Sequence, residues 1–374
     1  MAGHGFPDPG PATTQHRNVG ETTTGVRVSF PHVPPPYAVR KPRRRRAAVG
    51  VALVLAGAAI TISAISAAWL STASRSTAAF DEKAGFKPGM EINEAVLAAT
   101  DPDALYEAML RNQLMRPVHQ VTTEHYSNPQ WFEDAERLGH TVRQTRVDYE
   151  HNRVTEADTD YEVVDGVQVL HAQSRCVDGE GHRWSEYTGT WSGRPPGSCI
   201  PELIKVGSGD GIAPGGLSAK QADRYLRYLR GEFGDPISVG KPTLFRHDGK
   251  SYVRLPVKVT PLRTRDRGYT GMMLFQWALQ AAGISPLTYP YSNGGAAASG
   301  VEVTYYIDPA TTLPAYSFQR MTPVLNSAGE VRDPGERLSV RRSEYAFPER
   351  WRPYDLANPT DLEPIALTWH RDIR

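Results

Sequence analysis

One apolar run constrains this chain more than any other feature. Residues 47–70 read AAVGVALVLAGAAITISAISAAWL, carry no charged side chain and directly follow Arg43, Arg44, Arg45 and Arg46. A run of this length predicts a helix that crosses a bilayer, because a helix rises ~1.5 Å per residue and satisfies its own backbone hydrogen bonds. The arginines are typical of the cytoplasmic end of such a helix, and Trp69 suits the far interface. The sequence therefore predicts a single-pass protein of the cell membrane with a cytoplasmic N-terminus.

A cleaved signal peptide is the alternative interpretation of the same run. Ser66, Ala67 and Ala68 offer the small side chains that border a cleavage site. However, 46 residues precede the run, and the run itself exceeds the usual apolar core of about 7–15 residues. We therefore expect an uncleaved signal anchor.

The predicted anchor divides the chain into four regions. Residues 1–46 form a Pro- and Arg-rich tail without apolar periodicity, which we expect to be disordered in the cytoplasm. Within it, residues 34–37 (PPPY) match a polyproline ligand, so this tail is either a docking segment for a cytoplasmic partner or a solvated linker. The span itself covers 47–70 and a polar tether 71–89. Residues 90–374 are predicted to form one extracytoplasmic domain.

Charge is distributed unevenly between these regions. Residues 1–46 carry eight Lys and Arg against two acids, a net charge of +6. The span has no charge and the whole chain carries +1, so −5 remains for the outer part. Nucleic acids and anionic lipid surfaces require concentrated positive charge on the partner. The acidic outer region therefore argues against both as ligands.

The only two cysteines, Cys176 and Cys199, both lie in the predicted outer region. An even pair in an oxidising compartment favours a disulfide, with two buried free thiols as the alternative. Neither cysteine has a CxxC companion, and the 11 histidines are scattered without ligand spacing. We predict neither a metal site nor a bound cofactor.

Helical patterns recur in the outer region. Asp101 followed by Pro102 is typical of an N-cap and a first helical residue, and it predicts a helix over 101–114. Further helices are predicted at 128–139, 218–231 and 271–282. The last of these, GMMLFQWALQAA, is apolar almost all round, which is typical of a helix that is buried in a core or that covers a cavity.

Period-two patterns alternate with these helices. Asp165 and Gly166 between apolar runs predict a hairpin over 163–169. Pro256 in the middle of one run predicts an edge strand or a bulge there. The other predicted strands are 182–187, 251–260, 301–307, 315–321 and 337–347.

The order of these elements, together with the segment YYIDPATTLP, resembles the LolA-like and LppX/LprG-like lipid- or lipoprotein-binding fold. The residues that carry the resemblance are Tyr306, Ile307, Asp308, Pro309, Thr312, Leu313 and Pro314, with a weaker match at Glu344, Tyr345, Ala346 and Phe347. The resemblance implies an α+β fold in which a curved antiparallel sheet forms a half-barrel with helices packed in or over its concave face. The predicted fold class adds a single N-terminal transmembrane helix to that domain. Asp308 and Pro309 are interpreted as a turn and a fold marker, without a catalytic role.

The resemblance also implies a function, a membrane-anchored binding protein that holds a lipid or a lipoprotein acyl chain. Helix 271–282 would then act as a plug or lid. The candidate lining comprises Met272, Phe275, Trp277, Leu279, Val303, Tyr305 and Tyr316. The alternative is a structural or signalling ectodomain with a solid core, coupled to a cytoplasmic partner through the tail. An enzyme is disfavoured, because the sequence contains no GxSxG, HExxH or P-loop motif.

Overall fold

The structure is a computed structural model, and the chain divides into two units, residues 1–57 and 58–374. All described residues belong to the second unit. They are 80–126, 140–151, 153–165, 167–177, 179–186, 188–197, 199, 214–231, 236–264, 268–270, 273–284, 300–323, 325–326, 328–331 and 340–365. The predicted anchor with Arg43 to Arg46 and Trp69, the helix predicted over 128–139, and Met272 lie outside them.

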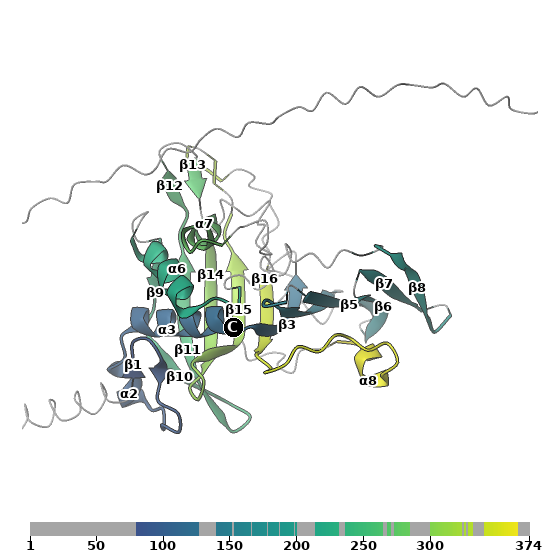
Figure 1. The fold of residues 1–374 in the computed structure, drawn as a ribbon, viewed down its shortest axis with the longest axis horizontal. Coiled ribbons are helices and arrows are strands. Elements are labelled where there is room, and N and C mark those ends of the chain that lie inside the picture. The colour runs from purple at the N-terminus through teal and green to yellow at the C-terminus, as the bar shows by residue number, and fades with distance from the viewer. Residues whose placement is uncertain are drawn as a thin grey trace, which may run out of the picture. The chain divides into compact units, whose positions relative to one another are not determined.

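One antiparallel sheet of 12 strands organises the described chain (Figure 1). Its strands follow the order β10-β11-β14-β15-β16-β3-β4-β5-β6-β7-β8, and β9 pairs with β11 beside β10. The bounds are β3 Val118–Tyr126, β4 His140–Asp148, β5 Arg153–Val164, β6 Val167–Val177, β7 Glu180–Ser185, β8 Thr190–Pro196, β9 Ile237–Val239, β10 Thr243–His247, β11 Lys250–Val259, β14 Val301–Asp308, β15 Leu313–Met321 and β16 Val340–Ala346. Two small pairs, β1 Phe80–Asp81 with β2 Gly85–Phe86 and β12 Leu262–Thr264 with β13 Gly268–Thr270, complete the described strands.

Alternation of apolar residues gives half of this sheet one hydrophobic face. In the pairing of β11 with β14, Leu255 lies opposite Tyr305 and Val257 lies opposite Val303. Residues that pair directly in an antiparallel sheet share a face, so these four side chains form one surface. All four are buried.

Helices cover that surface, which we call the helix-covered face (Figure 1). They are α2 Glu94–Ala98, α3 Pro102–Met115, α6 Ala219–Gly231 and α7 Met273–Ala281. The Asp101 side chain accepts hydrogen bonds from the first turn of α3, as the sequence predicts. Ser218 and Gln221 form the predicted capping box at the start of α6, with the Ser218 N–H donating to Gln221 Oε1 at 3.0 Å.

The C-terminal segment covers the opposite face of the other half of the sheet. Residues 347–365, which include α8 (Pro359–Leu362), cross β4, β5 and β6, and we call them the C-terminal strap. The Ile365 N–H donates to Thr159 Oγ1 at 3.0 Å, and Tyr161 Oη donates to the Ile365 carbonyl at 2.9 Å. No helix or strand is predicted from the sequence beyond residue 347, whereas the strap closes a small core around Tyr354.

Pro256 does not lie in an edge strand but at a bulge-like shift of register, the second of the two predicted alternatives, since residues 240–242 lie opposite only residues 255 and 256. Strand β11 is an interior strand, flanked by β14 on one side and by β10 and β9 on the other. Pairing with β10 ends at Arg254, and pairing with β9 begins at Val257. Pro256 sits where one partner replaces the next, so no ladder hydrogen bond is lost there. The hairpin predicted over 163–169 is confirmed, since β5 and β6 meet at Asp165 with φ of 52°.

The predicted fold class also requires correction. No helix among the described residues is long and apolar enough to cross a membrane. The described fold is a broad antiparallel sheet with a few short helices. It begins at β1, inside the segment predicted as a tether.

Candidate functional site

The structure brings most of the predicted lining residues together in a packed core. Phe275 and Leu279 on α7 and Val303 and Tyr305 on β14 are each at most 2% exposed and belong to one continuous hydrophobic cluster. Trp277, on the same helix, is half-buried. Four of the predicted residues thus stabilise the attachment of α7 to the sheet.

Tyr316 lies on the other face of the sheet, which corrects its place in the predicted lining. It pairs with Tyr306, whereas Ser317 pairs with Tyr305. Because side chains alternate along a strand, Tyr316 points away from α7. It joins a separate aromatic cluster with Tyr252 and Phe318.

An open groove lies beside this core, between α3, α6 and β9, and we call it the α3–α6 groove. Its volume is about 590 Å³, within the range of about 300–1,000 Å³ that is typical of ligand sites. Its apolar lining comes from all three elements: Leu110, Leu226, Leu229, Ile237 and Val239. Its polar and acidic lining comprises Glu82, Asp101, Asp103, Tyr106, Glu107 and Arg230, with Ala104 between them.

Two ion pairs fix α3 against α6. Arg111 Nε lies 2.9 Å from Asp223 Oδ1, and Arg230 pairs with Glu107. The lower-numbered residue on α3 pairs with the higher-numbered residue on α6, so the two helices run antiparallel. The start of α3 and the end of α6 therefore lie at the same end of the groove.

Tyr106 is the most unusual polar residue of the groove. Its side chain is 4% exposed and its ring packs 6.2 Å from the ring of Tyr305. Burial raises the pKa of the Tyr106 hydroxyl, so this group stays protonated. Its oxygen has no hydrogen-bond partner among the described residues. A buried hydroxyl of this kind is costly unless a ligand or water completes it.

No feature predicted from the sequence indicates this groove. Asp101 is predicted as a helix cap, and the structure confirms that role. The available signal was the i, i+3, i+4, i+7 stripe of Asp103, Tyr106, Glu107 and Leu110, in which acidic and apolar residues share a side of α3.

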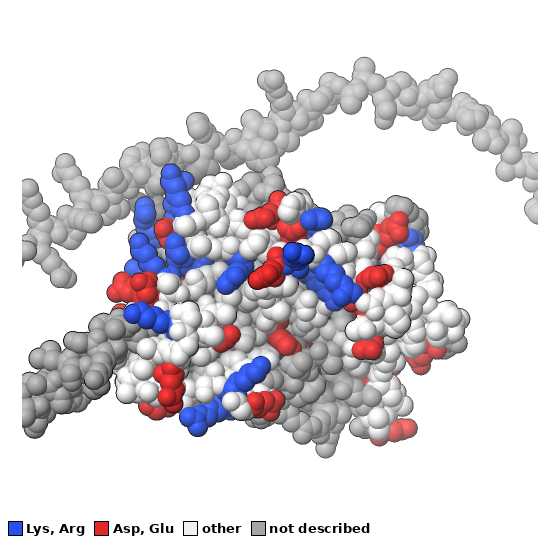
Figure 2. All heavy atoms as spheres, turned by 60° about the horizontal axis from the view of Figure 1, so that its bottom comes forward, with Lys and Arg blue, Asp and Glu red and all other residues white. Residues whose placement is uncertain are grey.

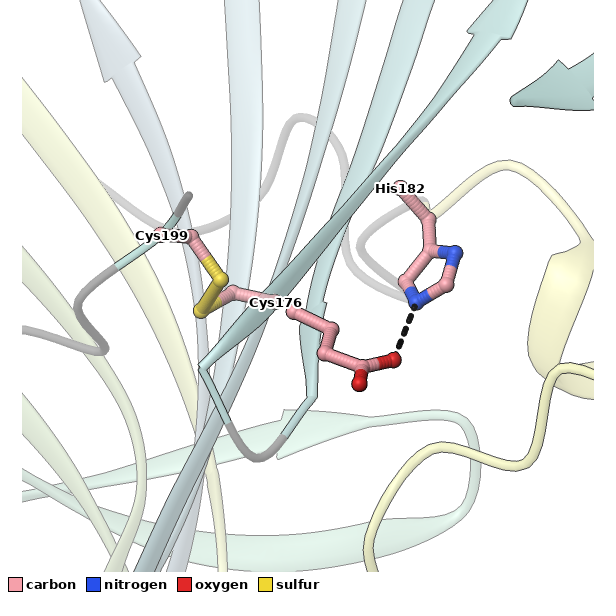
Figure 3. The surroundings of a disulfide bond; sticks show 4 residues. Cys176, His182 and Cys199 are labelled. Atoms are coloured by element: carbon pink, nitrogen blue, oxygen red, sulfur yellow. Dashed lines mark ion pairs between the residues drawn. A yellow bond between two sulfur atoms is a disulfide. The ribbon is translucent and has the colours of Figure 1, made fainter. Parts of the chain in front are cut away.

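The predicted disulfide is confirmed and borders a second cleft. Cys176 in β6 is bonded to Cys199 beyond β8, and Figure 3 shows this bond beside the strand that carries His182. The cleft has a volume of about 310 Å³. Its lining is charged and includes Glu156, Asp158, Asp160, Arg175, Arg183 and Arg194. Such a cleft does not suit an apolar ligand.

Charge over the rest of the surface is mixed. Figure 2 shows acidic and basic side chains scattered among uncharged residues on the face that it displays. Within the described residues, no three His, Cys, Asp or Glu side chains gather in a way that could hold a metal ion. The α3–α6 groove is a described hollow that combines an apolar part with a defined polar end.

Comparisons with known proteins leave the family open. No family model matches the sequence, and no curated protein matches it. Among solved structures, a β-barrel-like protein of domain of unknown function DUF1849 from Brucella abortus covers 65% of this chain and 100% of its own, at 11% identity and a TM-score of 0.13. A likeness at that level carries no argument about fold or function.

Proposed function

We propose that this chain is a non-enzymatic binding protein that holds the apolar part of a small amphipathic ligand, such as a lipid acyl chain, in the α3–α6 groove. The observation that carries the proposal is the groove itself. Leucines from α3 and α6 and two aliphatic residues of β9 meet around an open volume of about 590 Å³. A ligand that removes apolar surface of this kind from water lowers the free energy by about 25 cal/mol per Å².

The disulfide supports a proposal about the compartment. A bond between Cys176 and Cys199 persists in an oxidising environment and is rare in the cytosol. We therefore propose that the binding domain works outside the cytosol, where the disulfide is not reduced. In the chain-entropy model, closing this loop stabilises the domain by about 3 kcal/mol.

The test is ligand capture by the full-length chain. We would extract the purified protein with organic solvent, search the extract for lipid by mass spectrometry, and titrate the protein with an apolar fluorophore. Ala104 lines the groove, so Ala104→Trp fills it and should lower fluorophore affinity at least tenfold. Ala281→Trp, at an exposed position on α7, is the matched control and should leave affinity unchanged.

A structural domain without a ligand is the alternative function. The packing of Phe275, Leu279, Val303 and Tyr305 into a solid core is the observation that favours it. This alternative predicts no co-purified lipid and no saturable fluorophore binding. It also predicts that Ala104→Trp and Ala281→Trp behave alike.

A further inference from the structure

The rim of the α3–α6 groove carries an excess of negative charge at one end. Glu82 comes from the turn between β1 and β2, Asp101 and Asp103 from the start of α3, and Glu107 from its next turn. Arg230, at the end of α6, is the single basic residue among the described residues that line the groove. Lys83 neighbours Glu82 in the chain but does not line the groove. Four carboxylates therefore face one guanidinium.

Helix dipoles do not cancel this excess. The N-terminus of α3 carries about +0.5 charge and the C-terminus of α6 about −0.5. Because the helices are antiparallel, both termini lie at this end of the groove and largely offset each other. Asp101 also has a structural role, since it accepts hydrogen bonds from the N–H groups of Asp103 and Ala104. The remaining three acids still outnumber Arg230.

The polar and apolar parts of the groove are arranged in sequence along α3. Asp103 lies at its beginning, Tyr106 and Glu107 follow one turn later, and Leu110 lies a further turn along. On the antiparallel helix, Arg230 lies near the acidic end and Leu226 one turn before it. The buried Tyr106 hydroxyl, which has no partner among the described residues, marks the boundary between the two parts. This order matches a molecule with a polar head and an apolar tail.

The ion pair at the boundary is asymmetric. The Arg230 side chain is 63% exposed, whereas the Glu107 side chain is 15% exposed. Arg230 can turn into water and remain solvated there. Glu107 cannot follow it and would be left as a half-buried carboxylate without a counter-charge, which is unfavourable. A ligand that displaces Arg230 must therefore bring its own positive charge to Glu107.

We propose that the groove selects amphiphiles with a cationic head, an amine or a quaternary ammonium, and that this head replaces Arg230 as the partner of Glu107. The proposal rests on the proposed function and narrows its ligand class. The apolar tail occupies the leucine-lined part, and the head lies beside Glu107. No covalent step is involved.

The test uses three probes that share a twelve-carbon tail: dodecylammonium, dodecanol and dodecanoate. Each displaces the apolar fluorophore from the full-length chain at pH 7, below the concentration at which the probe aggregates. We expect dodecylammonium to displace it at a concentration at least tenfold below that of dodecanoate, with dodecanol between them. Salt should narrow this difference only modestly, because the Glu107 side chain is 15% exposed and screening acts mainly on exposed charges.

Substitutions assign the preference to the ion pair. Glu107→Gln should reduce the preference for dodecylammonium to threefold or less and leave dodecanol unchanged. Arg230→Gln should increase dodecylammonium affinity about fivefold, because it removes the competing cation. Glu94→Gln, an exposed acid in the first turn of α2, is the matched control and should change neither. If Glu107→Gln does not fold, Arg230→Gln and the paired substitutions Glu82→Gln and Asp103→Asn decide the same point.

The possible results distinguish the preference for a cationic head from the proposed binding function on which it rests. Equal displacement by all three probes, or identical behaviour of Glu107→Gln and Glu94→Gln, would overturn the cationic preference while leaving an apolar binding site intact. Failure of every probe to displace the fluorophore, dodecanol included, would overturn the binding function. A tighter interaction with dodecanoate than with dodecylammonium would reverse the assigned charge of the ligand.

Discussion

Two halves of one sheet are covered in different ways. Under α3, α6 and α7, the buried side chains are aliphatic and aromatic, as in Leu255 and Phe275, each 0% exposed. Under the C-terminal strap, the most buried residues include Arg175, Gln173 and Thr159, all at most 4% exposed. The same backbone architecture therefore carries a hydrophobic interface in one half and a hydrogen-bonded one in the other.

The buried guanidinium of Arg175 shows how the second interface works. Its Nε donates to the carbonyl of Asp361 at 3.1 Å, and its Nη2 donates to the carbonyl of Glu363 at 2.9 Å. These acceptors are backbone atoms of the strap, so one side chain fixes the path of the segment that covers it. Hydrogen bonds are directional, whereas apolar contacts tolerate shifts. An open groove is compatible with the apolar half, which can adapt around a ligand.

The largest expected effect is the loss of an aromatic ring from the apolar half. Phe275→Ala removes a fully buried side chain between α7 and the sheet and should lower the free energy of unfolding by about 3–5 kcal/mol. Phe318→Ala, half-buried on the opposite face, is the control and should cost far less. Urea denaturation followed by circular dichroism measures both. Similar losses at the two positions would contradict the assignment of a solid core to the α7 side.

A somewhat smaller loss is expected in the hydrogen-bonded half. The Asp361 carboxylate lies 3.4 Å from Arg146 Nη2 and 3.2 Å from Arg352 Nη2, and it accepts the Asp355 N–H at 2.8 Å. Asp361→Ala leaves Arg146 without this counter-charge and should cost about 3 kcal/mol. Hydrogen exchange should accelerate first in residues 347–365.

Asp355→Asn provides the matched control for that substitution. Asp355 is exposed, and its side chain only caps the N–H of Ala357. We expect a change below about 1 kcal/mol there. If exchange after Asp361→Ala rises uniformly across the sheet, the strap is not a separate cooperative unit and the contrast between the halves is weaker than described.

A lower pH should destabilise the fold through a buried histidine in β3, the strand that lies between the two halves. His119 in β3 is 2% exposed, and burial lowers its pKa to about 4. The unfolded chain binds a proton near pH 6.5, whereas the folded chain does not until about pH 4. The unfolded state therefore binds more protons between these values, and stability falls as pH decreases. At pH 5 the loss from His119 alone is about 2 kcal/mol.

Between pH 6.5 and pH 5, His119 should take up about one proton when the chain unfolds. His119→Gln should abolish this uptake and flatten the dependence of the free energy of unfolding on pH. His125, on the same strand, has its pKa lowered to about 4 by burial and by Arg341 and Arg143, and it contributes in the same direction. His171→Gln, at an exposed position in β6, is the control. An unchanged slope in His119→Gln would show that the imidazole is already solvated in the folded chain.

Local signals in the sequence predict individual elements of this fold well. Asp101 and Pro102 predict the start of α3, the Ser218–Gln221 box predicts α6, and Asp165 predicts the turn between β5 and β6. Each of these signals acts through hydrogen bonds or backbone angles within a few residues. The cysteine pair is predicted from its count and compartment, and the structure confirms it.

Relations between distant segments are not predicted in the same way. The pairing of Tyr305 with Ser317 places Tyr316 on the outer face, and a shift of one residue in register would reverse that. The neighbour of β16 is β3, far away in the chain, so the sheet order depends on long-range pairing. The groove likewise needs α3, α6 and β9 to meet, which no single stretch of sequence encodes.

The smallest expected effect sharpens the contrast between the halves. The Arg111–Asp223 pair joins α3 to α6, but the Asp223 side chain is 42% exposed, so water screens the attraction. Arg111→Gln should therefore change the free energy of unfolding by no more than about 0.5 kcal/mol. Asp361→Ala in the strap-covered half removes interactions of similar length and should cost several times more, because its carboxylate is only 6% exposed. If the two substitutions cost the same in urea denaturation, burial does not distinguish the two interfaces, and ion pairs hold the helices as strongly as they hold the strap.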